Sequence, residues 1–186
     1  MPAVANIQSM LRVYLDTAAL SSLIEKKIDP ETEAVRELLR LGREGAVTPL
    51  HSGVVDSWLW GGRAEGRKAA LQPELDAARA EDVSSSLPIA KFSASALQKL
   101  TGEQKGHLYP QITQAYARWF YQRSEIGLIV HTLTASQHQA DLLATPEAAK
   151  WPRFVPANIE RIALKENGRP LIFTMPSKAL ERVGSP

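Results

Sequence analysis

The sequence predicts one three-layer α/β domain over residues 1–186, built on a mostly parallel sheet of about five strands. Three observations predict this fold class. Short apolar runs alternate along the chain with longer segments of helical periodicity. The apolar fraction is 44% and the charged fraction is 23%, as in an ordinary globular domain. A chain of 186 residues is long enough to bury one substantial core. Strands that alternate with helices form parallel sheets covered on both faces.

The chain begins with a strand that leads directly into a helix. Residues 11–15 (LRVYL) form a short apolar run that is typical of a buried strand. Asp16 and Thr17 follow, and either side chain can cap a helix over residues 18–27. This arrangement places an acid at the point where the first strand ends.

A second helix has clear start signals. Asp29 is expected to be its N-cap and Pro30 its first residue, with an apolar face at helical spacing. We expect Gly42 or Gly45 to end it. Residues 46–50 (AVTPL) then form a second strand.

The middle of the chain is expected to be helical. A helix over residues 54–59 is interrupted by the pair Gly61-Gly62. Residues 63–108 are charged and rich in alanine, which predicts helices joined by exposed turns, or a helical insert. Residues 110–120 and 125–139 show apolar spacing typical of two further helices.

The C-terminal part again alternates strand and helix. Residues 141–145 (DLLAT) are expected to form a buried strand, residues 158–167 a helix that ends at Asn167-Gly168, and residues 170–174 the last strand.

Composition excludes several classes of site. The chain has no cysteine, so disulfides, thiolate zinc sites and thiol nucleophiles are excluded. No apolar stretch reaches the roughly 18 residues of a membrane span, and the first residues show no secretory signal. We therefore expect a cytoplasmic protein without a membrane partner. A net charge of +2 neither requires nor excludes a nucleic-acid partner.

Acidic residues follow the predicted strands where a parallel sheet collects its functional groups. Asp16 ends the first strand, Asp56 lies in the helix after the second strand, and Glu147 follows residues 141–145. Carboxylates gathered at one edge favour a hard divalent cation, which can activate water against a phosphodiester. The alternative for Asp16 is a purely structural helix cap.

These residues resemble the PIN family of metal-dependent ribonucleases. The stretch VYLDTAAL at 13–20 is similar to the opening strand of PIN domains, and residues 33–56 are similar to their second unit, with Asp56 matching its acid. Residues 128–135 and 141–147 resemble later motifs of one PIN subgroup, so the likeness covers nearly the whole chain. It implies a PIN-like sheet.

The resemblance also implies roles for particular residues. Asp16, Asp56 and Glu147 would be the catalytic acids, and Asp16 and Glu147, with Glu125, would hold magnesium or manganese. We assign substrate contacts to three further residues, namely Thr17, His51 and Thr145. His131 matches a histidine of the subgroup and is expected, like His138, to be structural rather than a metal ligand.

One departure from the family decides the expected activity. The third acid of the family falls on Leu128 here, and Glu125 lies one helical turn earlier. The resemblance therefore implies weakened or lost catalysis with a nucleic-acid or protein-binding role. Two alternatives stay open. One is an active magnesium- or manganese-dependent ribonuclease, such as the toxin of a toxin–antitoxin pair, and the other is an unrelated α/β binding module. RNA, an antitoxin-like or other protein and a homodimer are the partners considered.

Overall fold

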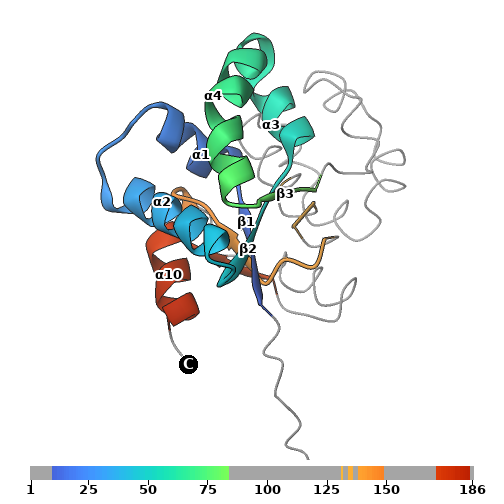
Figure 1. The fold of residues 1–186 in the computed structure, drawn as a ribbon. Helices are drawn as coiled ribbons and strands as arrows, with labels where there is room; N and C mark the ends of the chain where they lie inside the picture. The colour runs from blue at the N-terminus through green and yellow to red at the C-terminus, as the bar shows by residue number, and fades with distance from the viewer. Residues whose placement is uncertain (1–9, 84–130, 132–133, 136–137, 149–170, 185–186) are drawn as a thin grey trace, which may run out of the picture.

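A computed structural model describes residues 10–83, 131, 134–135, 138–148 and 171–184. Within them lies a five-stranded, all-parallel sheet with the strand order β3-β2-β1-β4-β5 (Figure 1). Its strands are β1 (Leu11–Leu15), β2 (Val47–His51), β3 (Glu81–Asp82), β4 (Leu142–Ala144) and β5 (Ile172–Thr174). The predicted α/β class with a parallel sheet is confirmed.

Helices pack against one face of this sheet through a shared hydrophobic core. They are α1 (Thr17–Ile24), α2 (Pro30–Arg43), α4 (Ala64–Ala77) and α10 (Pro176–Gly184). Val13 and Leu15 of β1 enter this core with fully buried side chains, and Leu38 of α2 lies against them. Figure 1 shows α2 and α10 side by side, and these two helices are in contact.

The opposite face of the sheet is buried as well. Tyr14 points away from its neighbours Val13 and Leu15, because successive side chains of a strand alternate between faces. It packs in a second core with Leu50 and Leu143, and all three side chains are fully buried. Ala135 belongs to this second core. A parallel sheet buried on both faces is the middle layer of a three-layer α/β fold.

Several predicted elements are confirmed with their caps. Strand β1 has the predicted bounds, and Asp16 caps α1 by accepting a hydrogen bond from the main-chain N–H of Ala19. Asp29 caps α2 in the same way, and Pro30 is the first residue of that helix. These signals are local, so they are readable without knowledge of the tertiary contacts.

The end of α2 differs from the expectation at one glycine. Gly42 lies inside the helix, which continues to Arg43, and Gly45 adopts the left-handed conformation with a φ of 74°. A Cβ at Gly42 would lie 2.6 Å from Cγ of Pro49 and 2.7 Å from the main-chain oxygen of Ala78. Gly42 therefore permits close packing, and Gly45 supplies the turn.

The described part of residues 63–108, which ends at residue 83, contributes to the sheet and to its core. Helix α4 buries Leu71 and Leu75 in the first core, and the two-residue strand β3 follows it beside β2. Strand β3 was not predicted, because Glu81 and Asp82 are exposed acidic residues without an apolar pattern. Helix α10 was not predicted either. The helices expected at 110–120 and 158–167 lie outside the described residues, as do residues 84–108.

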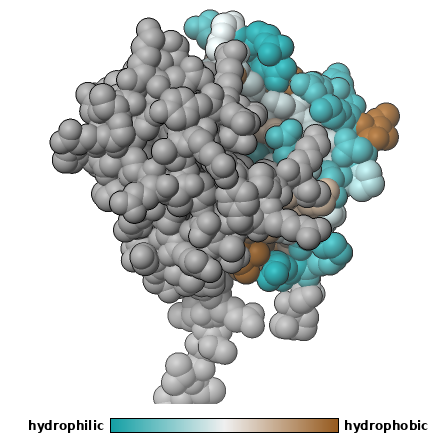
Figure 2. All heavy atoms as spheres, turned by 180° about the vertical axis from the view of Figure 1, so that it is seen from behind, coloured by the Kyte–Doolittle hydropathy of each residue, from teal (hydrophilic) through white to brown (hydrophobic). Residues whose placement is uncertain are grey.

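Helix α3 (Gly53–Trp60) and a short 3-10 turn (Gly61–Arg63) connect β2 to α4. Gly61 has a φ of 58°, which accounts for the predicted interruption of the helix. Among the described helices, none has the length and apolar character needed to cross a membrane. On the described part of the surface in Figure 2, hydrophobic atoms are isolated rather than gathered into a patch, and the exposed large hydrophobic residues are Met10 and Ile28.

Candidate functional site

The candidate site lies along the carboxyl ends of the parallel strands. Strand β1 pairs with β2 on one side and with β4 on the other, so the chain changes direction between β1 and β4. Ligands of open parallel sheets bind at such a position. The residues that follow these strands are polar and buried, namely Asp16 and Thr17 after β1, His51 at the end of β2, and Thr145 after β4.

Asp16 is at the centre of this edge. Its residue surface is only 6% exposed, and one carboxylate oxygen accepts the 2.8 Å hydrogen bond from Ala19 that caps α1. Burial raises the pKa of Asp16 to about 7, although hydrogen bonds from Thr145 and Ala19 oppose the rise. The charges of Asp56 and Glu147 raise it further. Asp16 is therefore both a helix cap and an acid whose pKa is raised by the charges of two other acids.

Thr145 links Asp16 to Glu147. The hydroxyl of Thr145 makes a hydrogen bond to the carboxylate of Asp16, and its oxygen accepts the main-chain N–H of Glu147 at 3.2 Å. Thr145 is fully buried, and the main-chain N–H of Asp16 points toward the oxygen of Ala144 at 3.5 Å. The predicted strand ends near Asp16 and Glu147 are thus adjacent in space. The hypothesis that carboxylates gather at one edge of the sheet requires this.

Asp56 is held from the other side of β1 by a chain of side chains. The hydroxyl of Thr17 donates to Oδ1 of Asp56 across 2.5 Å, and the same hydroxyl lies 2.7 Å from Nε2 of His131. The second ring nitrogen of His131 lies 2.8 Å from the hydroxyl of Tyr14. All four residues are buried, with exposures of at most 9%. Because the hydroxyl of Thr17 is engaged at both ends, it has little capacity left for a substrate.

A small pocket opens beside Asp56. Oδ2 of Asp56 lies 3.7 Å from Nδ1 of His51, which is too long for a direct hydrogen bond. The pocket has a volume of about 60 Å³, which is enough for a few water molecules. Its polar lining comes from His51, Asp56, Lys68, Gln72 and Asp82, and its apolar lining includes Leu20, Trp60, Leu71 and Leu75. His51 therefore lies at a strand end and beside an acid, and its contact with a substrate stays a prediction.

The predicted metal ligands are only partly brought together. Asp16 and Glu147 lie within electrostatic reach of each other, whereas Glu125 lies outside the described residues. No group of three or more acidic, histidine or cysteine side chains in the described part of the chain is arranged to hold a metal ion. The mutual repulsion at Asp16 would be relieved by a cation, but the described ligand set for magnesium is incomplete.

Two residues of the site were not identified from the sequence. In the sequence Tyr14 is part of an apolar strand pattern, and only the structure shows that its hydroxyl contacts His131. Asp82 lies on the unpredicted strand β3 and accepts the main-chain N–H of Gly53 at 3.0 Å. The structural role expected for His131 agrees with its burial and its contacts with Tyr14 and Thr17.

Comparison of the chain with protein-family models, curated proteins and solved structures gives no match. The assignment of a function therefore depends on the residues at the carboxyl edge of the sheet.

Proposed function

We propose that this chain is a PIN-like domain, related to magnesium-dependent ribonucleases, in which catalysis is weakened and a nucleic-acid or protein-binding role remains. One observation carries the proposal. Asp16, at the end of β1, experiences the negative charges of both Asp56, from α3, and Glu147, from beyond β4. These three acids come from separate parts of the chain and occupy the positions that the family resemblance assigns to catalytic acids.

The weakening of catalysis follows from the ligand count. A hard divalent cation is held by several oxygen ligands, and each missing carboxylate lowers the negative charge that attracts it. Leu128 replaces the third acid of the resemblance and cannot bind a cation or orient a water molecule. Oδ1 of Asp56 already accepts a hydrogen bond from the hydroxyl of Thr17, which leaves this acid one oxygen for a cation or a substrate.

In this proposal the polar residues of the pocket bind part of the RNA or a water molecule. Oδ2 of Asp56 and Nδ1 of His51 face each other at 3.7 Å, a separation that a shared hydrogen-bonding group can bridge. A ribose hydroxyl or a water molecule placed there would donate to the carboxylate of Asp56. Lys68 lines the pocket and is exposed, so its ammonium group is available to a phosphate.

The test is an RNA cleavage assay across a titration of magnesium and manganese. It compares the native chain with Asp16→Asn, which removes an acid, and with Leu128→Asp, which restores one. Weakened catalysis predicts that cleavage appears, or rises strongly, only in Leu128→Asp and depends on the metal. If the metal changes neither cleavage nor RNA binding in any of the three proteins, the chain is an unrelated α/β binding module.

An active ribonuclease, such as the toxin of a toxin–antitoxin pair, is the second candidate. The link from Asp16 through Thr145 to Glu147 favours it, because a site that had lost all activity would not need an acid at that place. This candidate predicts metal-dependent cleavage by the native chain that is lost in Asp16→Asn and in Glu147→Gln. In that case an antitoxin-like protein is the expected partner.

A further inference from the structure

We propose that Tyr14, His131 and Thr17 form a positioning chain that fixes the carboxylate of Asp56, with His131 held as the neutral tautomer that carries its proton on Nε2. The chain runs from the hydroxyl of Tyr14 to Nδ1 of His131, from Nε2 to the hydroxyl of Thr17, and from there to Oδ1 of Asp56. The inference goes beyond the proposed function, because it assigns Thr17 to the support of Asp56 rather than to the substrate.

The direction of the chain follows from counting protons. The oxygen of Thr17 makes two short polar contacts, at 2.5 Å to Asp56 and at 2.7 Å to His131. Each contact needs a proton, since two lone pairs at these distances repel, and the hydroxyl supplies only one. The hydroxyl donates this hydrogen to Oδ1 of Asp56, so the second proton must be on Nε2 of His131. Nδ1 then carries the lone pair and accepts from Tyr14.

The protonation state of His131 supports this count. Burial lowers the pKa of His131 to about 4, although the charge of Asp56 opposes the change, so the imidazole is neutral near pH 7 and has one proton to place. The hydroxyl of Tyr14 lies 2.8 Å from Nδ1 of His131 and supplies the hydrogen of that contact. Tyr14 and His131 are also in edge-to-face contact, with ring centroids 5.5 Å apart.

One contact favours the opposite tautomer, but it is longer than the two contacts that favour a proton on Nε2. The main-chain N–H of Thr17 lies 3.2 Å from Nε2 of His131 and would be satisfied by a lone pair on that nitrogen. With the proton on Nδ1 instead, however, one of the two shorter contacts of the Thr17 hydroxyl would have no proton. A 3.2 Å contact is weaker than contacts of 2.5 and 2.7 Å, so the shorter pair sets the tautomer.

The consequence for Asp56 is a fixed orientation. A carboxylate anchored through Oδ1 cannot rotate freely, and its Oδ2 stays directed toward His51 and the pocket. An acid that acts on a substrate gains from such pre-orientation, because reacting groups must be held within a fraction of an ångström. The catalytic part of this inference rests on the proposed function, whereas the tautomer and its coupling to Asp56 do not.

The test is nitrogen NMR of the imidazole of His131 in the full chain. We expect the proton on Nε2 in the native protein. In Asp56→Ala the hydroxyl of Thr17 is free to donate to Nε2, so the proton of His131 should move to Nδ1. The control is Asp82→Asn, which changes another carboxylate of the same pocket and should leave the tautomer unchanged. A proton on Nδ1 of His131 in the native chain, or a tautomer that is unchanged in Asp56→Ala, overturns the proposal.

A second measurement separates positioning from substrate contact. Thr17→Val removes the hydroxyl and keeps the shape, and Thr17→Ser keeps the hydroxyl. If the native chain cleaves RNA, Thr17→Val should lower kcat by about tenfold to 100-fold with little change in KM, and Thr17→Ser should restore it. A rise in KM at unchanged kcat would make Thr17 a substrate contact and overturn its positioning role. If the native chain does not cleave RNA, the active-ribonuclease candidate fails, and the tautomer measurement alone decides the inference.

Discussion

The side chains of Thr17 and Asp56, which are 39 residues apart in the sequence, are joined by a 2.5 Å hydrogen bond. This bond connects the start of α1 to α3 and holds Asp56 close enough to Asp16 to raise the pKa of that carboxyl group. On the other side of β1, Thr145 connects Asp16 to Glu147. The acids of the candidate site are thus held together by threonine hydroxyl groups at two neighbouring strand ends.

Replacement of Asp16 by Asn should make the protein more stable at high pH. Burial raises the pKa of Asp16 from 3.8 to about 7, so the folded state holds this proton more tightly than the unfolded state. The resulting stabilisation is fully present below pH 3.8 and is lost as the pH rises through 7. A shift of this size corresponds to about 4 kcal/mol, as an upper figure.

The measurement is urea unfolding of the native chain and of Asp16→Asn between pH 4 and pH 8. Asn keeps an oxygen that can accept the N–H of Ala19, so the cap of α1 is retained. We expect the free energy of unfolding of the native chain to fall relative to that of the variant as the pH rises. A difference that does not vary with pH would contradict the raised pKa.

The central strands and the first helices were predictable because their signals are local. Strand β1 is an apolar run, and α2 begins with a capping Asp29 and with Pro30. Strand β3 could not be predicted, because the pairing of Glu81 and Asp82 with β2 is a tertiary contact that the local sequence does not encode. A two-residue acidic strand has no pattern of its own.

The candidate site was predictable in part for the same reason. An acid at a strand end is visible in the sequence, so Asp16 was identified from its position, and Asp56 and Glu147 from their places after later strands. The partnership of Tyr14 with His131 spans 117 residues and depends on the alternation of side chains across β1. No spacing rule reports a contact at that separation, so the positioning chain became visible only in the structure.

Magnesium should stabilise the native chain through Asp16 and Glu147. A cation relieves the repulsion between these acids. A magnesium concentration about five times the dissociation constant of the site adds about 1 kcal/mol to the free energy of unfolding. For a chain of this length the melting temperature should rise by about 2–4 °C. The experiment is thermal unfolding with and without magnesium at pH 8.

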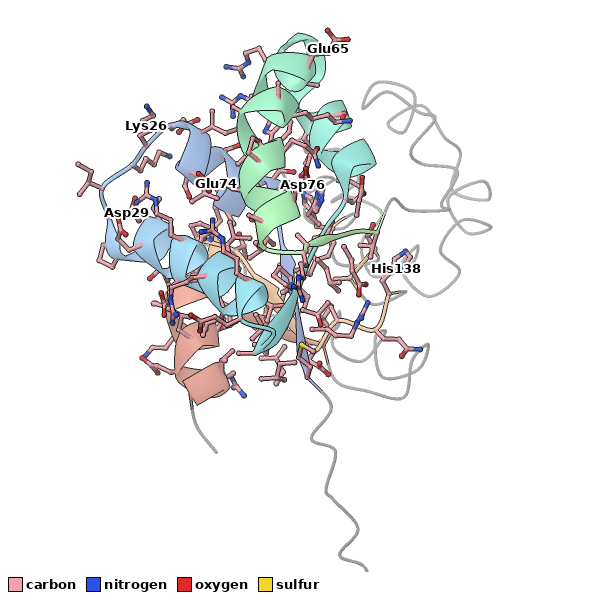
Figure 3. The ribbon with its side chains drawn as sticks, viewed as in Figure 1. Lys26, Asp29, Glu65, Glu74, Asp76 and His138 are labelled. Carbon is pink, nitrogen blue, oxygen red and sulfur yellow. The ribbon has the colours of Figure 1, made fainter. Side chains whose placement is uncertain are left out.

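The variant for this test is Glu147→Gln, and the matched control is Glu65→Gln. Glu65 is exposed on α4 and points away from the sheet (Figure 3). The magnesium-induced rise should be smaller in Glu147→Gln and unchanged in Glu65→Gln. Equal rises in the native chain and in Glu147→Gln would show that the cation binds elsewhere.

Replacement of Gly42 by Ala should destabilise the protein, although alanine favours helices. The added Cβ would lie 2.6 Å from Cγ of Pro49 and 2.7 Å from the main-chain oxygen of Ala78, closer than packed atoms approach. Overpacking of this kind costs about 1–3 kcal/mol. Gly62→Ala is the control, because nothing lies within 4 Å of a Cβ there. Urea unfolding should show a loss for Gly42→Ala and little change for Gly62→Ala, and equal effects would refute the close packing of α2.

The C-terminal helix α10 should depend on Glu31. The carboxylate of Glu31 accepts hydrogen bonds from the main-chain N–H of Ser177 at 2.9 Å and from its hydroxyl at 2.7 Å. Glu31→Ala removes both and should cost about 1 kcal/mol, with faster hydrogen exchange in α10. Glu33→Ala, in the same turn of α2, removes an exposed ion pair with Arg36 and should leave the exchange of α10 unchanged. If α10 exchanges at the native rate in both variants, Glu31 does not hold this helix.

The most direct test of the acidic edge is the pKa of the Asp16 carboxyl group, followed by carbon NMR across a pH titration. We expect a pKa of about 7 in the native chain and a lower pKa in Glu147→Gln, because that variant removes one of the charges that raise it. A carboxyl group that titrates near its ordinary value of 3.8, or that is unaffected by Glu147→Gln, would contradict the meeting of these acids at one edge of the sheet.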